Sequence, residues 1–395
     1  MHPRRSSLFH ALLLAAGFLI GGAAACGSSS EDSHNAAGGQ AGDQAGSASG
    51  GSSAGPSMGG GSAADGVGAA GGAGAAGKVG GGAGMGAVAP LGTFAIASTA
   101  RGNCALDASG AVQCWGSSPN VWPVPAGAFV ELHASIDAMC AIRADRTVAC
   151  FDPPDGSVSG ITSVAPTGKV RSLALQRGAL CGVDDSGQVF CNSAYTELKA
   201  PAGEMFSQVS VGVHLACGIR VADDSVTCWG FAGDAACSVQ IPAAGQLMAP
   251  AGAFAGISSG FYSTCGLDKT GAVSCWGAGK ATDDATAMCM GSPYNLGQAA
   301  APPGAFLSVA VGANHSCGVK TDGTVACWGA GTADVGCPDT GVDCRQSRPP
   351  AGTFAQVSVG NLHSCAITAD RKVQCWGYPG ADAGDGRLVP PMVFQ

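Results

Sequence analysis

Charged and aromatic side chains are scarce in this chain of 395 residues. Only 12% of the residues are charged, 6% are aromatic, and no block of lysine and arginine occurs. A groove that follows a nucleic-acid backbone needs clustered positive charge. The formal net charge here is −8, so we expect no nucleic-acid partner. Beyond the N-terminus, no segment is long and apolar enough to be a candidate membrane span.

The N-terminus has the pattern of an export signal. Arg4 and Arg5 precede an apolar run over 11–20, and three alanines lead to Cys26. The run is too short for a typical membrane span but suits a signal peptide over 1–25. The alanines before Cys26 resemble a bacterial lipobox, which predicts lipidation of that cysteine, with plain secretion as the alternative. The arginine pair also suggests twin-arginine export, although the residues after it fit that signal poorly.

The next segment, 26–89, predicts a stalk. After Cys26 it is almost wholly Gly, Ala and Ser and has no apolar periodicity. Such a segment cannot bury a core, so we expect it to be disordered. A flexible chain of this length has an r.m.s. reach of roughly 45 Å, which would hold a folded domain over 90–395 clear of a membrane.

Residues 90–395 are built from seven repeats. Each repeat has two cysteines, separated by ten residues in six repeats and by eleven in one: Cys104 and Cys114, Cys140 and Cys150, Cys181 and Cys191, Cys217 and Cys228, Cys265 and Cys275, Cys317 and Cys327, and Cys365 and Cys375. A Pro-x-Gly precedes each pair, and five of the second cysteines continue as Cys-Trp-Gly. Such a compound pattern indicates one structural unit used seven times.

Each unit is predicted to consist of strands. "VAVG" and "VSVG" alternate with a period of two, and "CGVKTDGTVAC" predicts a hairpin. Placing Cys317 opposite Cys327 leaves a three-residue loop in which Gly323 takes the left-handed conformation. Arg146 and Arg371 replace that glycine in two repeats, at a cost of about 1 kcal/mol each. Opposed residues of such a hairpin lie within disulfide reach, so an exported chain is expected to close one disulfide per hairpin.

Seven all-β units of this size favour a seven-bladed β-propeller. The C-terminal "PPMVFQ" repeats the Pro-x-x-x-Phe start of a unit, apart from its glycine. We expect it to form an isolated first strand that helps to close the ring.

The repeated phrase resembles the regulator-of-chromosome-condensation repeat in its short, cysteine-containing bacterial form. "VAVGANHSCGVKTDGTVACWG" and "VSVGNLHSCAITADRKVQCWG" match best, and the first three repeats are degenerate. The resemblance covers about 90–395 and implies seven blades. The role of the eukaryotic namesake on chromatin and a small GTPase does not carry over, because this chain is predicted to be exported and acidic. A secreted bacterial β-lactamase inhibitor of related architecture binds its enzyme with one face of the ring. That resemblance implies only this way of binding a protein and no individual contact residue.

The stretch His315-Ser316-Cys317 could be a nucleophile with its base or part of a zinc site. The same order recurs at His363-Ser364-Cys365, and a site for asymmetric chemistry is not normally tiled around a ring. We therefore interpret both as structural, with each histidine bonded to neighbouring backbone. His133 and His214 are predicted to be surface or hairpin-end residues. We predict no catalytic residue, cofactor or metal.

Residues that do not repeat are the better candidates for binding. Trp122 lies outside the Cys-Trp-Gly motif and is a candidate exposed contact, whereas the repeated tryptophans are expected to pack between blades. Four further cysteines lie in the three longest inter-repeat segments, roughly 231–249, 278–301 and 330–349. Cys337 and Cys344 are close enough to pair locally, and Cys237 and Cys289 would then bridge neighbouring insertions. Other pairings or free thiols are the alternatives.

Together these features predict a monomeric, non-catalytic lipoprotein of the bacterial cell envelope. Its lipid would anchor it at the outer membrane or cell surface, and its insertions would bind a protein or a glycan. One alternative is a structural or adhesive component without a specific ligand. Another is an enzyme with a site at the central opening, for which the sequence offers no cluster of unrepeated carboxylates or histidines.

Overall fold

The computed structural model describes residues 95–100, 102–116, 122–135, 138–151, 165–176, 178–193, 198–230, 245–280, 288–289, 292–293, 295–332, 344–378 and 386–394. The chain divides into two compact units, 1–70 and 71–395. Every described residue belongs to the second unit. The predicted signal peptide and the whole predicted stalk over 26–89, including Cys26, lie outside the described residues and remain predictions.

Each of the seven repeats forms one antiparallel three-stranded sheet, or blade, whose strands follow in chain order. The inner strands are β1 (Ile96–Ser98), β4 (Glu131–Ala134), β7 (Val170–Gln176), β10 (Phe206–Val211), β13 (Phe254–Ser259), β18 (Phe306–Val311) and β21 (Phe354–Val359). The middle strands are β2 (Gly102–Leu106), β5 (Met139–Ile142), β8 (Ala179–Asp184), β11 (Leu215–Arg220), β14 (Ser263–Asp268), β19 (His315–Lys320) and β22 (His363–Thr368). The outer strands are β3 (Val112–Gly116), β6 (Val148–Phe151), β9 (Val189–Ser193), β12 (Val226–Gly230), β15 (Val273–Gly277), β20 (Val325–Gly329) and β23 (Val373–Gly377).

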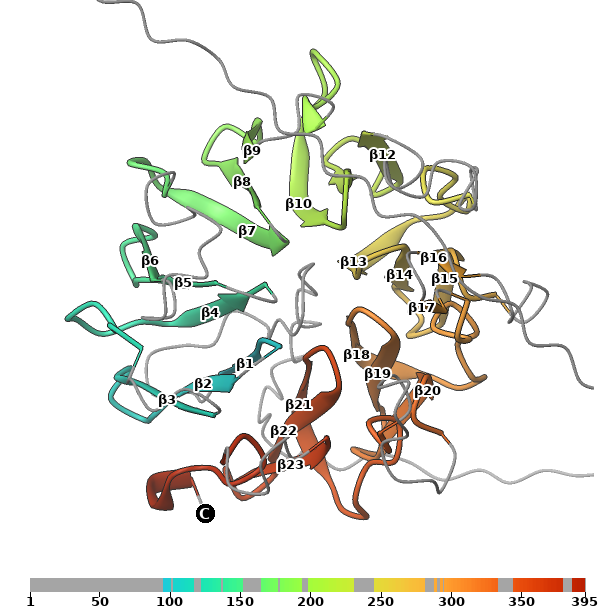
Figure 1. Cartoon of the computed structure of the whole chain (residues 1–395). Helices are drawn as coiled ribbons and strands as arrows, with labels where there is room; N and C mark the ends of the chain where they lie inside the picture. Colours follow the sequence, from blue (N-terminus) through green and yellow to red (C-terminus); the bar gives the residue numbers. More distant parts are fainter. Residues whose placement is uncertain are drawn as a thin grey trace, which may run out of the picture. The chain divides into compact units, whose positions relative to one another are not determined.

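The seven blades form a closed ring around a central axis (Figure 1). Seven clusters of buried side chains each join two consecutive blades. One of them joins Ile367 and Val373 of the seventh blade to Ile96 of the first. The core is therefore divided among the blade interfaces, and the predicted seven-bladed β-propeller is confirmed. A short pair, β16 (Met288–Cys289) and β17 (Ser292–Pro293), lies outside the blades.

The hairpin between middle and outer strands has the predicted geometry. In the sixth blade the N–H of Lys320 donates to the carbonyl of Thr324 at 2.8 Å, which leaves the three-residue loop 321–323. Gly323 has a φ of 83°. Asp322 accepts hydrogen bonds from the hydroxyl and the N–H of Thr324 at 2.7 and 2.9 Å. The bond from the Thr324 hydroxyl lowers the pKa of the Asp322 carboxyl, so the carboxylate that fixes the loop stays ionised.

The two arginine substitutions in this loop follow the same backbone. Arg146 and Arg371 both have a φ of 69°, as predicted for the position that glycine occupies in other blades. Arg146 also donates to Asp185 in the next blade at its exposed end.

All seven predicted disulfides are present, with Cα–Cα distances of 3.9–4.1 Å. Each joins the middle strand of a blade to its outer strand. The cysteine on the middle strand is fully buried, whereas its partner on the outer strand is half-buried where the structure describes it. Disulfides of this number are typical of proteins in an oxidising compartment.

The C-terminal prediction was wrong in its secondary structure. The segment Met392–Phe394 forms a 3₁₀ helix instead of a strand. Pro390 and Pro391 have no N–H to offer a sheet, and the N–H of Phe394 donates to the Pro391 carbonyl at 2.8 Å. Phe394 is buried in the cluster that joins the seventh and first blades, so the segment does help to close the ring.

Candidate functional site: the blade interfaces and the insertion-bearing end

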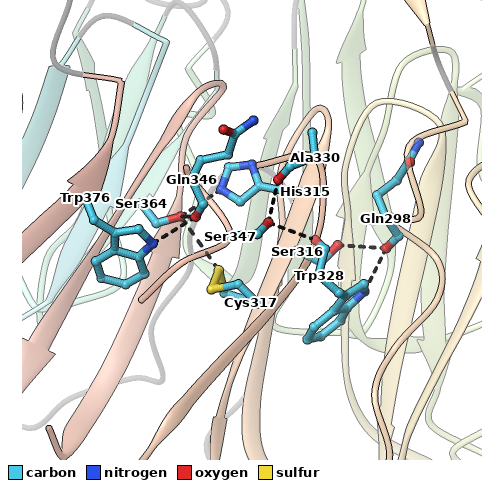
Figure 2. The surroundings of a disulfide bond; sticks show 11 residues. Gln298, His315, Ser316, Cys317, Trp328, Ala330, Gln346, Ser347, Ser364 and Trp376 are labelled. Carbon is cyan, nitrogen blue, oxygen red and sulfur yellow. Dashed lines mark hydrogen bonds between the residues drawn. A yellow bond between two sulfur atoms is a disulfide. The ribbon is translucent and has the colours of Figure 1, made fainter. Parts of the chain in front are cut away.

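The His-Ser-Cys stretch of the sixth blade lies inside the interface with the seventh (Figure 2). His315 Nε2 lies 2.7 Å from the hydroxyl oxygen of Ser364, at the start of the next middle strand. Ser364 in turn donates to the carbonyl of Gln346 at 3.5 Å. That carbonyl also accepts the indole N–H of Trp376 at 2.8 Å. All four residues are buried.

His315 Nε2 and the Ser364 hydroxyl share one hydrogen bond, whose direction depends on the tautomer of the ring. Burial lowers the pKa of His315 to about 3, so the ring is neutral at physiological pH. The predicted backbone partner was wrong: the histidine is structural, but its partner is a side chain of the next blade.

The seventh blade repeats this link to the first blade with different partners. His363 Nε2 donates to Asn103 Oδ1 at 2.8 Å, and Asn103 Nδ2 donates to the carbonyl of Arg387 at 2.8 Å. Burial lowers the pKa of His363 to about 3 as well. The two histidines therefore join the seventh blade to its two neighbours, the sixth and the first.

The chemistry of this stretch excludes the nucleophile reading. Cys317 is bonded to Cys327 and has no thiolate. Ser316 is fully buried and donates to the carbonyl of Gln298 at 2.9 Å. Across the residues that the structure describes, no group of three or more His, Cys, Asp and Glu side chains is placed to hold a metal ion.

The bases of two insertions are closed by buried glutamines. Gln298 and Gln346 are fully buried, and their side-chain carbonyls accept the N–H of Leu296 at 2.8 Å and of Cys344 at 2.6 Å. A Cβ on Gly331 would lie 2.3 Å from Gln346 Oε1, so only glycine fits at that position. Gln346 thus packs against Gly331, near the start of its insertion, and binds Cys344 toward its end. Gln298 does the same with Gly279 and Leu296.

Sequence reasoning missed these glutamines, although a signal was present. Gln246, Gln298 and Gln346 each stand four residues before the proline of the next repeat. Each also gives its backbone carbonyl to the indole of a Cys-Trp-Gly tryptophan, at 3.1, 2.9 and 2.8 Å. The prediction that the motif tryptophans pack between blades is confirmed, because each lies in or against a cluster that joins two blades: Trp115, which is half-buried, and Trp229, Trp276, Trp328 and Trp376, which are buried.

The turns between inner and middle strands lie at the same end of the blades as these bases, because each outer strand ends opposite the start of its middle strand. In the last four blades these turns are 212–214, 260–262, 312–314 and 360–362, and none contains Asp, Glu, Lys or Arg. Phe261 and Tyr262 are half-buried and meet edge to face, with ring centroids 6.0 Å apart.

The hairpin loops between middle and outer strands lie at the opposite end of the blades. These loops hold ion pairs between neighbouring blades, such as Lys269 with Asp224 at 2.6 Å. Arg220 also lies 3.4 Å from Glu204. The turns between inner and middle strands of blades four to seven therefore differ from the hairpin loops at the opposite end, because they contain no Asp, Glu, Lys or Arg.

Two histidine predictions have different outcomes. His133 is buried on β4 and lies 3.2 Å from Glu131 Oε2, so its surface assignment was wrong. The alternation of β4 sends both side chains into the interface with the third blade, which the sequence pattern alone did not reveal. His214 is half-buried in the turn before β11, with a φ of 61°, as predicted for a hairpin-end residue.

Trp122 is not an exposed contact. It is 6% exposed and packs edge to face on Phe151, with ring centroids 6.0 Å apart. Phe151 occupies the place of the missing motif tryptophan in the second repeat, and Trp122 fills the same interface from the preceding segment. Its position outside the motif reflects this compensation.

The four additional cysteines are only partly covered. Cys344 is buried and disulfide-bonded. Its partner is a cysteine whose side chain the structure does not describe. Cys237 and Cys337 lie outside the described residues, and of Cys289 only the backbone in β16 is described. The proposed pairings of Cys337 with Cys344 and of Cys237 with Cys289 stay predictions.

Comparison with known proteins agrees with this geometry. The family described as the Regulator of chromosome condensation (RCC1) repeat matches residues 306–333 and 354–380. Blades six and seven are RCC1 repeats. The matched segments run through β18–β20 and β21–β23 and include both His-Ser-Cys stretches, so these stretches belong to the RCC1 repeat and are not an added site.

Two solved structures similar to this chain are a plant ectodomain and a yeast protein. The ectodomain of the receptor kinase CR4 from Physcomitrella patens is 22% identical, with a TM-score of 0.53, and the match covers 73% of this chain and 74% of that one. Prp20p from Saccharomyces cerevisiae is 16% identical, with a TM-score of 0.49, over 70% of this chain and 78% of that one. At such identities the likeness to the ectodomain concerns the fold alone.

Among the described residues, no helix is long and apolar enough to cross a membrane.

Proposed function

We propose that this chain is an exported, lipid-anchored binding protein without catalytic activity, and that it binds a protein or a glycan through the insertion-bearing end of its ring. The observation that carries the proposal is the construction of the insertion bases. Buried Gln298 and Gln346 accept hydrogen bonds from Leu296 and Cys344, in the part of two insertions that leads into the next blade. Fixing the ends of a segment on a rigid scaffold is how propellers and similar folds present binding loops.

The surface beside these bases suits recognition. The turns at 260–262, 312–314 and 360–362 carry aromatic and amide side chains and no charge. The core of a protein interface is depleted of charged residues and enriched in aromatic ones. Sugars offer apolar ring faces and hydroxyl groups, which match the same kinds of side chain.

The location rests on two features. The seven disulfides favour an oxidising compartment, and Cys26 follows the predicted signal peptide. Replacing Cys26 with Ala should release the protein from the membrane fraction and abolish labelling by a fatty-acid analogue. Unchanged fractionation and labelling of the variant would refute the lipid anchor and leave the binding proposal untouched.

The binding proposal is tested by affinity capture with the oxidised domain 90–395. Envelope and culture fractions are passed over the wild type, over a variant with 231–244, 281–294 and 333–343 replaced by short Gly-Ser linkers, and over a variant with charge-neutral hairpin loops at the opposite end. We expect one saturable partner that is lost only with the trimmed insertions. Equal capture by all three proteins would refute the proposal, and broad adhesion without saturation would favour the structural alternative.

A further inference from the structure

The outer strand of the seventh blade forms the floor of a groove. A hollow of about 410 Å³ is lined by Arg348, Pro350, Val373, Gln374, Cys375, Trp376, Leu388 and Pro390. Four of these residues are consecutive in β23. The others come from the segment that leads into the blade and from the C-terminal segment that closes the ring.

The backbone groups of β23 that face this groove have no strand to pair with. The sheet ends at β23, and the disulfide partners Cys365 and Cys375 lie 4.0 Å apart at Cα, which is typical of a non-hydrogen-bonded pair. Hydrogen-bonded and non-hydrogen-bonded pairs alternate along an antiparallel ladder. Thr368 and Lys372, three pairs further along, are a hydrogen-bonded pair, because the N–H of Thr368 donates to the carbonyl of Lys372. The N–H and C=O groups of Val373, Cys375 and Gly377 therefore point away from β22. In the part of the chain that the structure describes, no hydrogen bond reaches them.

The two walls of the groove stand on opposite faces of the blade. Trp376 faces the segment of Gln346, whose carbonyl it binds, and Pro350 continues that segment. Val373 and Cys375 pack with Phe394 on the other face, and Leu388 and Pro390 precede Phe394. Val389, between them, is 64% exposed. An edge strand lying between two largely apolar walls can hold a further strand whose side chains alternate between the walls.

We propose that this groove binds an extended peptide segment of a partner protein as a fourth strand of the seventh blade. Main-chain hydrogen bonds to the outward groups of Val373, Cys375 and Gly377 would supply affinity, and the two walls would select small apolar side chains at alternating positions. The groove borders the base of the third insertion through Arg348 but includes none of the segments trimmed in the capture experiment, so the two proposals are tested by different variants.

The first blade supplies a matched control. Its outer strand β3 has the same sequence as β23, Val-Gln-Cys-Trp-Gly, in the same register against its middle strand. Val373→Pro removes one outward N–H from β23 and no bond to β22. Val112→Pro makes the same change in β3. Thermal unfolding verifies that both variants remain folded.

The probe is a library of random nonapeptides selected on the oxidised domain 90–395. We expect selected peptides with alternating small apolar residues that bind with 1:1 stoichiometry. Val373→Pro should weaken their binding about two- to tenfold, the loss of one hydrogen bond, and Val112→Pro should leave it unchanged. A second experiment changes the peptides and leaves the protein intact. Peptides N-methylated at the alternate amides that face β23 should not bind, whereas the same peptides methylated at the other amides should still bind.

Three outcomes would overturn the proposal. In the first, the library yields no binder. In the second, the selected peptides bind Val373→Pro as tightly as the wild type, and N-methylation of the peptides does not weaken binding. In the third, the domain alone dimerises in sedimentation experiments and Val373→Pro abolishes the dimer, which would assign the groove to a second copy of this chain. Slower hydrogen exchange at Cys375 and Gly377 in the peptide complex is the direct support we expect.

Discussion

At the scale of single residues, the two buried histidines make stability depend on pH. Folding holds the pKa of His315 and His363 at about 3, against about 6.5 in an unfolded chain. Between these values the unfolded chain binds protons that the folded one does not, so stability falls as the pH falls below about 6.5. The loss at pH 4 should be about 1–3 kcal/mol for each histidine.

Urea unfolding of the oxidised domain 90–395 at pH 7, 5.5 and 4.5 measures this effect. Replacing both histidines with Gln should lower stability at pH 7 and flatten its pH dependence over this range. His214→Asn, at a half-buried position, serves as the control and should keep the wild-type slope. An unchanged slope in the double variant would show that other groups cause the acid sensitivity.

A second residue-scale prediction concerns the left-handed loop position. Arg371 has a φ of 69° where Gly323 of the sixth blade has 83°. A residue with a Cβ is strained there and glycine is not. Arg371→Gly should therefore raise the unfolding free energy by about 0.5–1 kcal/mol, and the reverse change Gly323→Arg should lower it by a similar amount. Melting temperatures that move in the same direction in both variants would contradict this explanation.

At the scale of the element, the hairpin disulfide holds the middle and outer strands together. Replacing Cys317 and Cys327 together with Ala should cost about 3 kcal/mol, because the closed loop no longer restricts the unfolded chain. Denaturant unfolding under non-reducing conditions gives this value. The corresponding double replacement of Cys365 and Cys375 should cost a similar amount. A loss near zero in both would mean that strand pairing alone fixes the hairpin.

The hairpins were predictable from the sequence because their geometry is local. A sequence separation of ten between the cysteines, with a glycine at the left-handed position, leaves one register for the loop at 321–323. The interface contacts were not predictable in this way. His315 bonds to Ser364, 49 residues away, and nothing in the repeat specifies which atom of the next blade a side chain will meet. His133 and Trp122 were misassigned for the same reason, since burial between blades is not a property of one repeat.

At the scale of the whole ring, closure depends on the C-terminal segment. In the fourth, fifth and sixth blades the motif tryptophan packs against a phenylalanine of its own blade, as Phe306 does with Trp328 at a centroid distance of 6.1 Å. In the first blade, Trp115 instead meets Phe394, with centroids 6.0 Å apart. Its indole donates to the carbonyl of Arg387 at 3.1 Å. The end of the chain thus supplies to the first blade the phenylalanine that blades four to six supply for themselves.

This arrangement predicts that Phe394→Ala destabilises the ring as a whole. Phe394 is 1% exposed between the seventh and first blades, and truncating such a side chain costs about 3–5 kcal/mol. Met392→Ala is the matched control, because Met392 is 87% exposed in the same 3₁₀ helix. Because the blades share interfaces around a closed ring, opening one junction exposes apolar surface on two blades at once. Hydrogen exchange should therefore rise in β1 and β22 together in Phe394→Ala and stay unchanged in Met392→Ala. Increased exchange confined to 386–394 would show that the ring closes without this phenylalanine.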